Sequence, residues 1–80
     1  MSAMSPEDYE DMMFGAAWRG AQRALPGGWH LWGVWTNVYD DGEPCGASAI
    51  DPNGDDVDAY GPTHTAALNA LTNTLNARHR

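Results

Sequence analysis

The residues with the most evident chemistry in this sequence are its carboxylates. Eleven Asp and Glu residues oppose four arginines, lysine is missing, and the net charge is −7 in a chain of 80 residues. A surface of this sign repels nucleic acid and anionic membranes and attracts basic partners. The acids are concentrated at the start of the chain and in two predicted turns, as three groups: Glu7, Asp8, Glu10 and Asp11; Asp40, Asp41 and Glu43; and Asp51, Asp55, Asp56 and Asp58.

Each acidic group also has a local structural explanation. Acids near the start of a helix interact favourably with its dipole, and Asp is a preferred turn residue. The whole set nevertheless favours a basic protein surface as partner, because spaced carboxylates can occupy arginines that would otherwise hold phosphates. The two turns are expected at opposite ends of one strand, so a single interface cannot include every acid. The candidate contacts are Glu7, Asp8, Glu10, Asp11, Asp40, Asp41, Glu43, Asp55, Asp56 and Asp58.

A second group of residues suited to binding is aromatic and lies in the stretch Trp29–Tyr39. Its aromatic and β-branched residues predict a strand, and strict alternation makes both of its faces apolar. One face carries Trp29, Leu31, Trp35 and Tyr39, and the other carries Trp32, Val34 and Val38. We expect the second face to pack on the core and the first to be exposed, although the pattern leaves the opposite assignment open. Exposed Trp29, Trp35 and Tyr39 would either anchor a partner or form a homodimer.

Residues able to bind metals are present, but without the spacing of a known site. A zinc site needs ligands at short, characteristic separations, which are missing among His30, His64, His79 and Cys45. The turn Asp51–Asp55 resembles the beginning of a calcium loop, but its sixth position is Asp56 instead of Gly and its twelfth is Pro62 instead of Glu. The sequence therefore predicts no metal and no other cofactor.

Nucleophilic chemistry has equally little support. The segment Gly46–Ile50, which contains Ser48, lacks the second glycine of a nucleophile elbow and is not followed by a predicted helix. Cys45 has no cationic residue nearby in the sequence that would activate its thiol. We therefore expect a protein without enzymatic activity.

The first element expected to position these residues is a helix over Pro6–Leu25. Ser5 suits its N-cap and Pro6 its first position, and Pro26–Gly28 ends it. Its apolar stripe has helical spacing and consists of Phe14, Ala17, Trp18, Ala21 and Leu25.

Three strands are expected next, beginning with a hairpin over Gly28–Ile50. They cover Trp29–Tyr39, Cys45–Ile50 and roughly Asp56–Tyr60, and the turns between them are Asp40–Pro44 and Asp51–Asp55. Thr63 then caps a second helix that runs to about Ala77. The stripe of this helix consists of Ala67, Leu68, Leu71 and Leu75.

The order α-β-β-β-α predicts one α+β domain that covers residues 1–80. Two amphipathic helices can bury their stripes by packing on one face of a three-stranded antiparallel sheet. A single cysteine cannot form an intramolecular disulfide, which is typical of a reducing compartment. The start of the chain has no basic signal-peptide region, and its longest apolar-rich run, Met12–Trp18, is too short to span a bilayer. We expect a cytoplasmic protein without a membrane partner.

Two local resemblances concern the entry into the second helix. The order of elements resembles the double-stranded-RNA-binding domain fold, and Tyr60–Leu68 is similar to that domain's passage from third strand to second helix. The lysines that hold RNA phosphates in that family are replaced here by Thr63, His64 and Thr65, so RNA binding is not expected. Gly61–Ala70 is similar to the helix entry of HicB-type antitoxins, without their acidic residue before the alanine. That similarity implies an alternative function, the neutralisation of a small basic toxin or nuclease.

In overall character, the chain resembles the small acidic anti-CRISPR proteins of phages that act on type I effector complexes. The resemblance implies a phage protein that works in the host cytoplasm and inhibits without catalysis. It would bind a basic surface of a type I CRISPR (Cascade) effector and block the binding of target DNA or the reading of its PAM. The partner would be a protein, and direct binding to nucleic acid is not expected.

Overall fold

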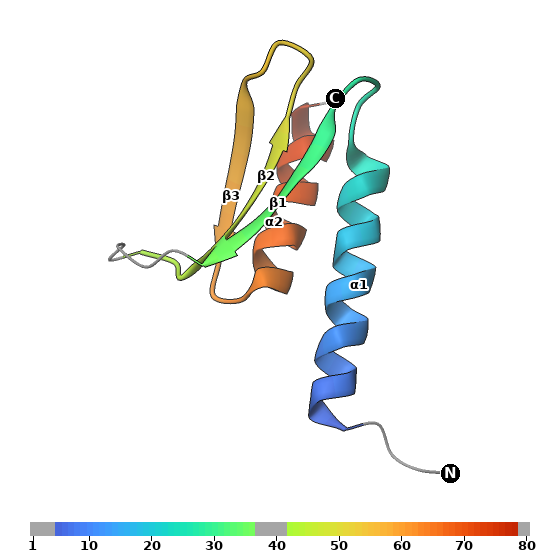
Figure 1. The fold of residues 1–80 in the computed structure, drawn as a ribbon, viewed down its shortest axis with the longest axis vertical. Helices are drawn as coiled ribbons and strands as arrows, with labels where there is room; N and C mark the ends of the chain where they lie inside the picture. Colours follow the sequence, from blue (N-terminus) through green and yellow to red (C-terminus); the bar gives the residue numbers. More distant parts are fainter. Residues whose placement is uncertain (1–4, 37–41, 79–80) are drawn as a thin grey trace.

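The computed structural model describes residues 5–36 and 42–78. Two helices flank three strands in the chain order α1 (Pro6–Ala24), β1 (His30–Thr36), β2 (Cys45–Ile50), β3 (Asp56–Gly61) and α2 (His64–Arg78). The strands form one antiparallel sheet in the order β1-β2-β3. The predicted α+β fold and its α-β-β-β-α order are therefore confirmed (Figure 1).

The limits of α1 follow from the residues at its two ends. The Ser5 hydroxyl accepts a hydrogen bond from the Asp8 N–H at 3.1 Å, and Pro6 stands where the helix needs no N–H donor. The helix ends at Ala24, one residue before the predicted end. Leu25 is extended because the ring of the following Pro26 disfavours a helical conformation for the residue before it.

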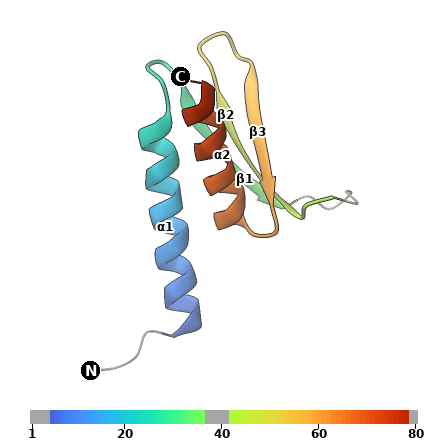
Figure 2. The same ribbon diagram turned by 180° about the vertical axis from the view of Figure 1, so that it is seen from behind.

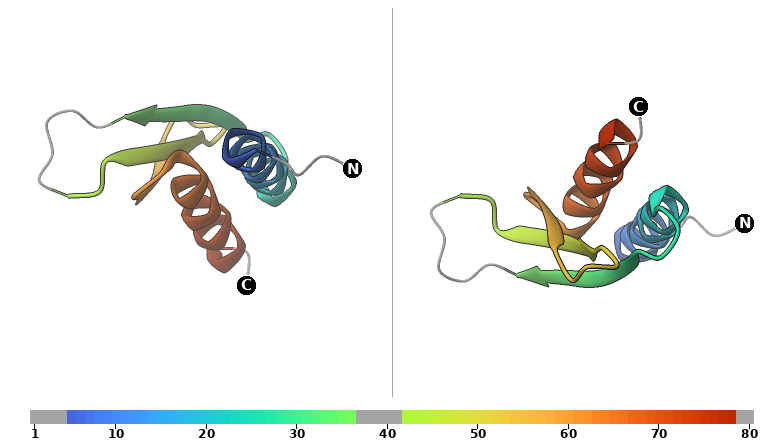
Figure 3. Two further views of the ribbon diagram at one scale, coloured as in Figure 1. Left: turned by 90° about the horizontal axis from the view of Figure 1, so that it is seen from below. Right: turned by 90° about the horizontal axis from the view of Figure 1, so that it is seen from above.

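The core lies between α2 and the sheet and is built on short side chains. The residues of β2 that face the helices are all small, namely Cys45, Ala47 and Ala49. Because these side chains are short, α2 can approach closely and fill the space with Leu68, Leu71 and Leu75, which are almost fully buried. In Figures 2 and 3, α1 stands beside α2, and it adds Ala17 and Ala21 to the same core.

The start of α2 is held by a side-chain cap and by a link to the sheet. Thr63 caps the helix as predicted, because its hydroxyl accepts a hydrogen bond from the Ala66 N–H at 3.1 Å. The first helical residue, His64, places Nε2 at 3.2 Å from the Thr36 hydroxyl at the end of β1. This contact joins the beginning of α2 to the edge of the sheet.

The N-terminal half of α1 extends past the rest of the fold. In Figures 1 and 2 its first turns continue beyond the start of α2 and the nearby end of the sheet. Its residues 6–13 are all exposed, including Tyr9, Met12 and Met13. Only the second half of the helix, from Phe14 onwards, packs against the core.

A bulge in β1 changes which of its side chains face the core. Leu31 pairs with Ala49, whereas Gly33 pairs with Ser48, so Trp32 is the extra residue. Gly33 has a φ of +153°, a backbone conformation that favours glycine. The alternation of side chains between the two faces of the sheet is therefore shifted by one residue after Trp32, so Val34 shares a face with Leu31.

The predicted division of this strand into two faces is partly wrong for that reason. Trp29 and Leu31, expected on the exposed face, pack against the core, whereas Trp32, expected in the core, is 66% exposed. Val34 packs against the core as predicted, and Trp35 lies on the exposed face as predicted. Two further residues of the predicted strand lie outside the described part of the chain, Val38 and Tyr39.

The predicted turn at Asp51–Asp55 is confirmed and is organised by its first carboxylate. Asp51 accepts hydrogen bonds from the N–H groups of Asn53 and Asp55, both at 2.9 Å. Gly54 has a φ of +91°, the positive value expected at the centre of this turn. The Asp51 carboxylate therefore has a structural role.

Candidate partner-binding face

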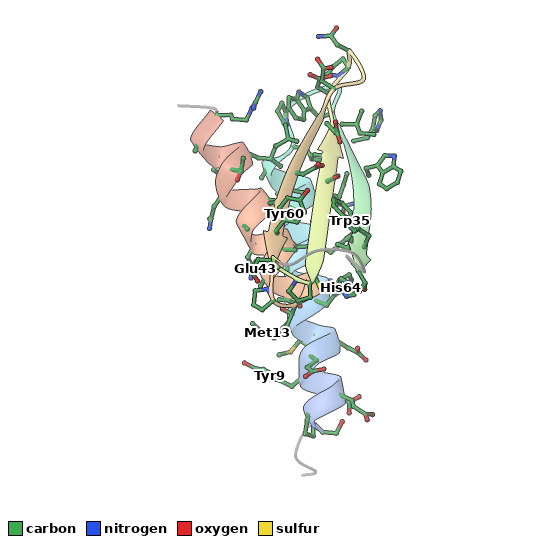
Figure 4. All side chains as sticks on the ribbon, turned by 90° about the vertical axis from the view of Figure 1, so that its left-hand side faces the viewer. Tyr9, Met13, Trp35, Glu43, Tyr60 and His64 are labelled. Carbon is green, nitrogen blue, oxygen red and sulfur yellow. The ribbon has the colours of Figure 1, made fainter. Side chains whose placement is uncertain are left out.

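The candidate site is the face of the sheet that is turned away from the helices, which we call the open face. Figure 4 looks onto this face, with the sheet in front of both helices. Alternation along the strands and the pairing between them place residues from all three strands on it. They are Trp32 and Trp35 of β1, Gly46, Ser48 and Ile50 of β2, and Asp56, Asp58 and Tyr60 of β3.

One row across the open face is aromatic. Pairing between strands aligns Trp35, Gly46 and Tyr60. Because Gly46 has no side chain, the indole of Trp35 lies over it, and a Cβ at this position would overlap the ring. Tyr60 meets this indole edge-on, with the ring centroids 6.0 Å apart and the planes at 87° (Figure 4). This is a favourable geometry for two aromatic rings, and it fixes the position of Trp35.

The neighbouring row is polar. It consists of Gly33, Ser48 and Asp58, paired across the three strands. The hydroxyl of Ser48, a buried residue, donates a hydrogen bond to the carboxylate of Asp58. This bond holds the carboxylate in one orientation on the exposed side of β3. Asp56, two residues earlier on β3, lies on the same face.

A hollow of about 400 Å³ lies on the open face beside Ser48. It is bounded on the β1 side by Trp32 and Trp35 and on the β3 side by Asp56 and Asp58. The hollow exists because Ser48, in the middle of the polar row, is small and does not fill the space between the large side chains around it.

The two sides of this hollow suit a positively charged group. Aromatic faces attract cations that lie within about 6 Å of the ring centroid. Carboxylates accept strong, charge-assisted hydrogen bonds from arginine and lysine. Because β1 and β3 are two strand spacings apart, about 10 Å, a side chain that enters between them can stack on an indole and reach a carboxylate.

The other predicted contacts are spread over the molecule. The first acidic group lies on the exposed N-terminal turns of α1, and Glu43 is exposed just before β2. Asp55 is exposed in the turn before β3. Asp56 and Asp58 line the hollow of the open face, whereas Glu10 and Asp11 line a separate hollow beside the exposed Tyr9. Three predicted contacts lie outside the described residues, Tyr39, Asp40 and Asp41.

Trp29, a predicted anchor, is not part of the open face. Its ring is half-buried and packs against the core, and the guanidinium carbon of Arg78 lies 5.8 Å from the ring centroid. Trp29 thus connects the segment after α1 with the last turn of α2. The structure gives it a packing role.

Sequence reasoning missed Trp32, Ser48 and Tyr60 as members of the site. For Tyr60 the signal was present, because strict alternation in β3 puts it on the same face as Asp56 and Asp58. For Trp32 the signal was the glycine that follows it, since glycine inside a strand often marks a bulge.

A second hollow, of about 360 Å³, lies between the projecting half of α1 and the start of α2. Tyr9 and Met13 line it from α1, and His64 lines it from α2 (Figure 4). Within residues 5–36 and 42–78, His, Cys, Asp and Glu side chains form no group of three that could hold a metal ion. In the same ranges neither helix combines the length and apolar character needed to cross a membrane.

The fold and the site together describe a small α+β protein with an aromatic and acidic sheet face. Comparison of the chain with protein families, with curated proteins and with solved structures finds no match. Its function is therefore argued from the chemistry of the open face.

Proposed function

We propose that this chain is a non-enzymatic binding protein that covers a basic, nucleic-acid-binding surface of another protein. The observation that carries the proposal is the hollow in which Trp32 and Trp35 face Asp56 and Asp58. Both of its sides attract positively charged side chains, and such side chains are what a phosphate-binding surface presents.

The mechanism is competition without turnover. Arginines and lysines that normally hold phosphates would instead bond to Asp56 and Asp58. Trp32 and Tyr60, which are 66% and 46% exposed, would supply apolar area of the kind that dominates the energy of protein interfaces. The net charge of −7 would steer the protein towards a positive surface and away from nucleic acid itself.

The partner that we propose is the DNA-binding surface of a type I CRISPR (Cascade) effector. Binding there would block target DNA and the reading of its PAM. The support for this choice is the resemblance in size and acidity to the phage anti-CRISPR proteins, together with a face that suits arginine and lysine.

A gel-shift competition tests the proposal directly. The purified protein is added to a type I effector complex before its PAM-bearing target DNA. We expect the shifted DNA band to disappear as the protein is added, and the inhibition to weaken as the salt concentration is raised. An unchanged shift would contradict competition at this complex and would direct attention to a small basic toxin or nuclease.

Two substitutions that change the net charge by the same amount distinguish a contribution of the open face to inhibition from a contribution of the net charge. Asp56→Asn and Asn73→Lys each make the protein less negative by one unit, but Asn73 is exposed on α2, away from the open face. We expect Asp56→Asn to weaken inhibition and Asn73→Lys to leave it almost unchanged. Equal losses would mean that the total charge matters and the hollow does not.

A further inference from the structure

The two carboxylates of the hollow on the open face have no positively charged partner within the described residues. The Asp58 carboxylate bonds to the Ser48 hydroxyl alone, and that of Asp56 forms no hydrogen bond or ion pair in the same part of the chain. Across the hollow, β1 presents the indoles of Trp32 and Trp35. The hollow therefore offers negative charge and flat aromatic surface to a group from another molecule.

One wall of the hollow is an aromatic surface that is fixed before any ligand binds. The indole of Trp35 lies over Gly46 and meets Tyr60 edge-on (Figure 4). Beside it, Trp32 extends outward from the bulge. Because the Trp35 ring is already held in place, little side-chain freedom is lost when a flat group stacks on it.

The opposite wall carries a carboxylate whose orientation is also fixed. The Ser48 hydroxyl donates to Oδ1 of Asp58, which leaves Oδ2 without a hydrogen bond from the described residues. Asp56 stands two residues earlier on the same face, about 7 Å away along the strand. A ligand that uses both carboxylates therefore needs several donors that point in different directions.

We propose that this hollow binds a single arginine side chain of the partner and prefers it to lysine, a refinement that rests on the proposed function. The flat face of the guanidinium stacks on the indole of Trp35, and N–H groups on its edge donate to Asp58. A further N–H group is directed along β3 towards Asp56. Guanidinium carries its N–H donors in one rigid plane, so it can stack on a ring and bond to carboxylates at the same time. The residue captured is then an arginine that would otherwise hold a phosphate.

Lysine fits the same hollow less well. Its ammonium group is a compact, strongly hydrated charge without a flat face, so it must give up water to lie against an indole. Guanidinium is more weakly hydrated than ammonium. The methylene groups of arginine can lie on Ile50, which lines the hollow from the central strand, while the charged end reaches the carboxylates. The apolar parts of the hollow therefore favour arginine.

Titration with short peptides, followed by NMR of the indole N–H groups, tests this preference. Two peptides with blocked ends are compared, in which glycines flank either one arginine or one lysine. We expect the arginine peptide to shift the indole signals of Trp32 and Trp35 and to bind roughly fivefold more tightly than the lysine peptide. The signals of Trp18 and Trp29, which pack against the core, should stay in place. Equal affinities for the two peptides, or shifts at Trp18 and Trp29 instead, would overturn the proposal.

A third peptide, with citrulline in place of arginine, separates charge from shape. Citrulline keeps the length and the planar end group of arginine but is neutral. We expect it to cause much smaller shifts than the arginine peptide at the same concentration, because a neutral donor bonds more weakly to a carboxylate. Binding as tight as that of the arginine peptide would overturn the role of the carboxylates.

Asp58→Asn tests the fixed carboxylate. The new amide oxygen can still accept the hydrogen bond from Ser48, but the amide N–H groups then face the hollow and repel a guanidinium. We expect the affinity for the arginine peptide to fall roughly tenfold. Asn73→Lys changes the net charge by the same amount on the exposed side of α2, and this control should leave the affinity almost unchanged. Equal affinities of the two variants would overturn the placement of the guanidinium. If Asp58→Asn does not fold, Asp56→Asn makes the same test at an exposed position.

The gel-shift competition with target DNA separates the arginine preference from the proposed function. Displacement of target DNA by a protein that binds both peptides equally would keep the proposed function and overturn the preference. Selective binding of the arginine peptide without displacement of target DNA would support the arginine site and overturn the proposed function, because the hollow would then serve another partner that presents an arginine.

Discussion

The two faces of β2 use small residues to opposite effect. On the inner face, Ala47 and Ala49 leave room that the leucines of α2 fill. On the outer face, Gly46 and Ser48 leave room that is only partly filled: the indole of Trp35 covers Gly46, and beside Ser48 a hollow remains. Similar chemistry in one strand thus produces a packed core on one side and an open, hollowed surface on the other, which is the proposed binding surface.

The difference between these faces lies in what covers them. A helix lies over the inner face, whereas the outer face is bordered by side chains from the edge strands β1 and β3. We therefore expect inner residues to contribute mainly to stability and, if the proposed function holds, outer residues to contribute mainly to binding. Substitutions on the two faces should separate these contributions.

The largest loss of stability is expected on the inner face, for Leu71→Ala. Leu71 is fully buried between α2 and the sheet, so its removal loses apolar contacts and leaves a cavity. We expect the free energy of unfolding in urea to fall by about 2–5 kcal/mol. Leu25→Ala, at a half-buried position after α1, is the matched control and should cost less. Equal losses would show that α2 is not the main cover of the core.

An intermediate effect is expected for Gly46→Ala on the outer face. The added Cβ would overlap the indole of Trp35, which would have to leave its place against Tyr60. We expect a loss of about 1–3 kcal/mol in the free energy of unfolding, together with a change in the near-ultraviolet circular dichroism of the aromatic rings.

Gly27→Ala is the control for this change. Gly27 is exposed, has no positive φ, and a Cβ there would meet no atom within 4 Å. The control should therefore leave both measurements almost unchanged. If Gly46→Ala behaves like the control, the indole of Trp35 does not rest on Gly46.

Much of the fold was predictable because the residues that begin and end its helices and strands act on their immediate neighbours in the sequence. Ser5 and Thr63 begin the helices through hydrogen bonds to N–H groups three residues later, and Pro26 ends α1 by its effect on the residue before it. The limits of β2 agree with the prediction, because turn residues flank the strand on both sides.

The assignment of the β1 faces was not predictable from alternation alone. One extra residue, Trp32, reverses the alternation halfway along the strand, and apolar residues on both faces gave no sign of the reversal. This reversal is one reason why the candidate site was only half predicted; Tyr60 was missed separately, although alternation in β3 places it on the same face as Asp58. Asp56, Asp58 and Trp35 were named as contacts, whereas Trp32 was assigned to the core.

The smallest effect on stability is expected for Trp32→Ala, and it contrasts with the same change at Trp29. Trp32 is 66% exposed at the bulge, so its removal should alter the free energy of unfolding by about 0.5 kcal/mol or less. Trp29 packs against the core and lies beside Arg78, so Trp29→Ala should destabilise the fold clearly more. Urea unfolding of the two variants measures the difference.

For binding we expect the opposite ranking, with a larger effect of Trp32→Ala than of Trp29→Ala. Trp32 forms one side of the hollow, so Trp32→Ala should weaken competition with target DNA although the fold stays intact. Trp29→Ala should keep this activity at temperatures where the variant remains folded, because Trp29 does not reach the open face. If Trp32→Ala unfolds the protein, the bulge does not turn this side chain outward. If both variants compete equally well, the open face is not the surface that binds. Two tryptophans only three positions apart can therefore decide which face of the sheet holds the molecule together and which one meets a partner.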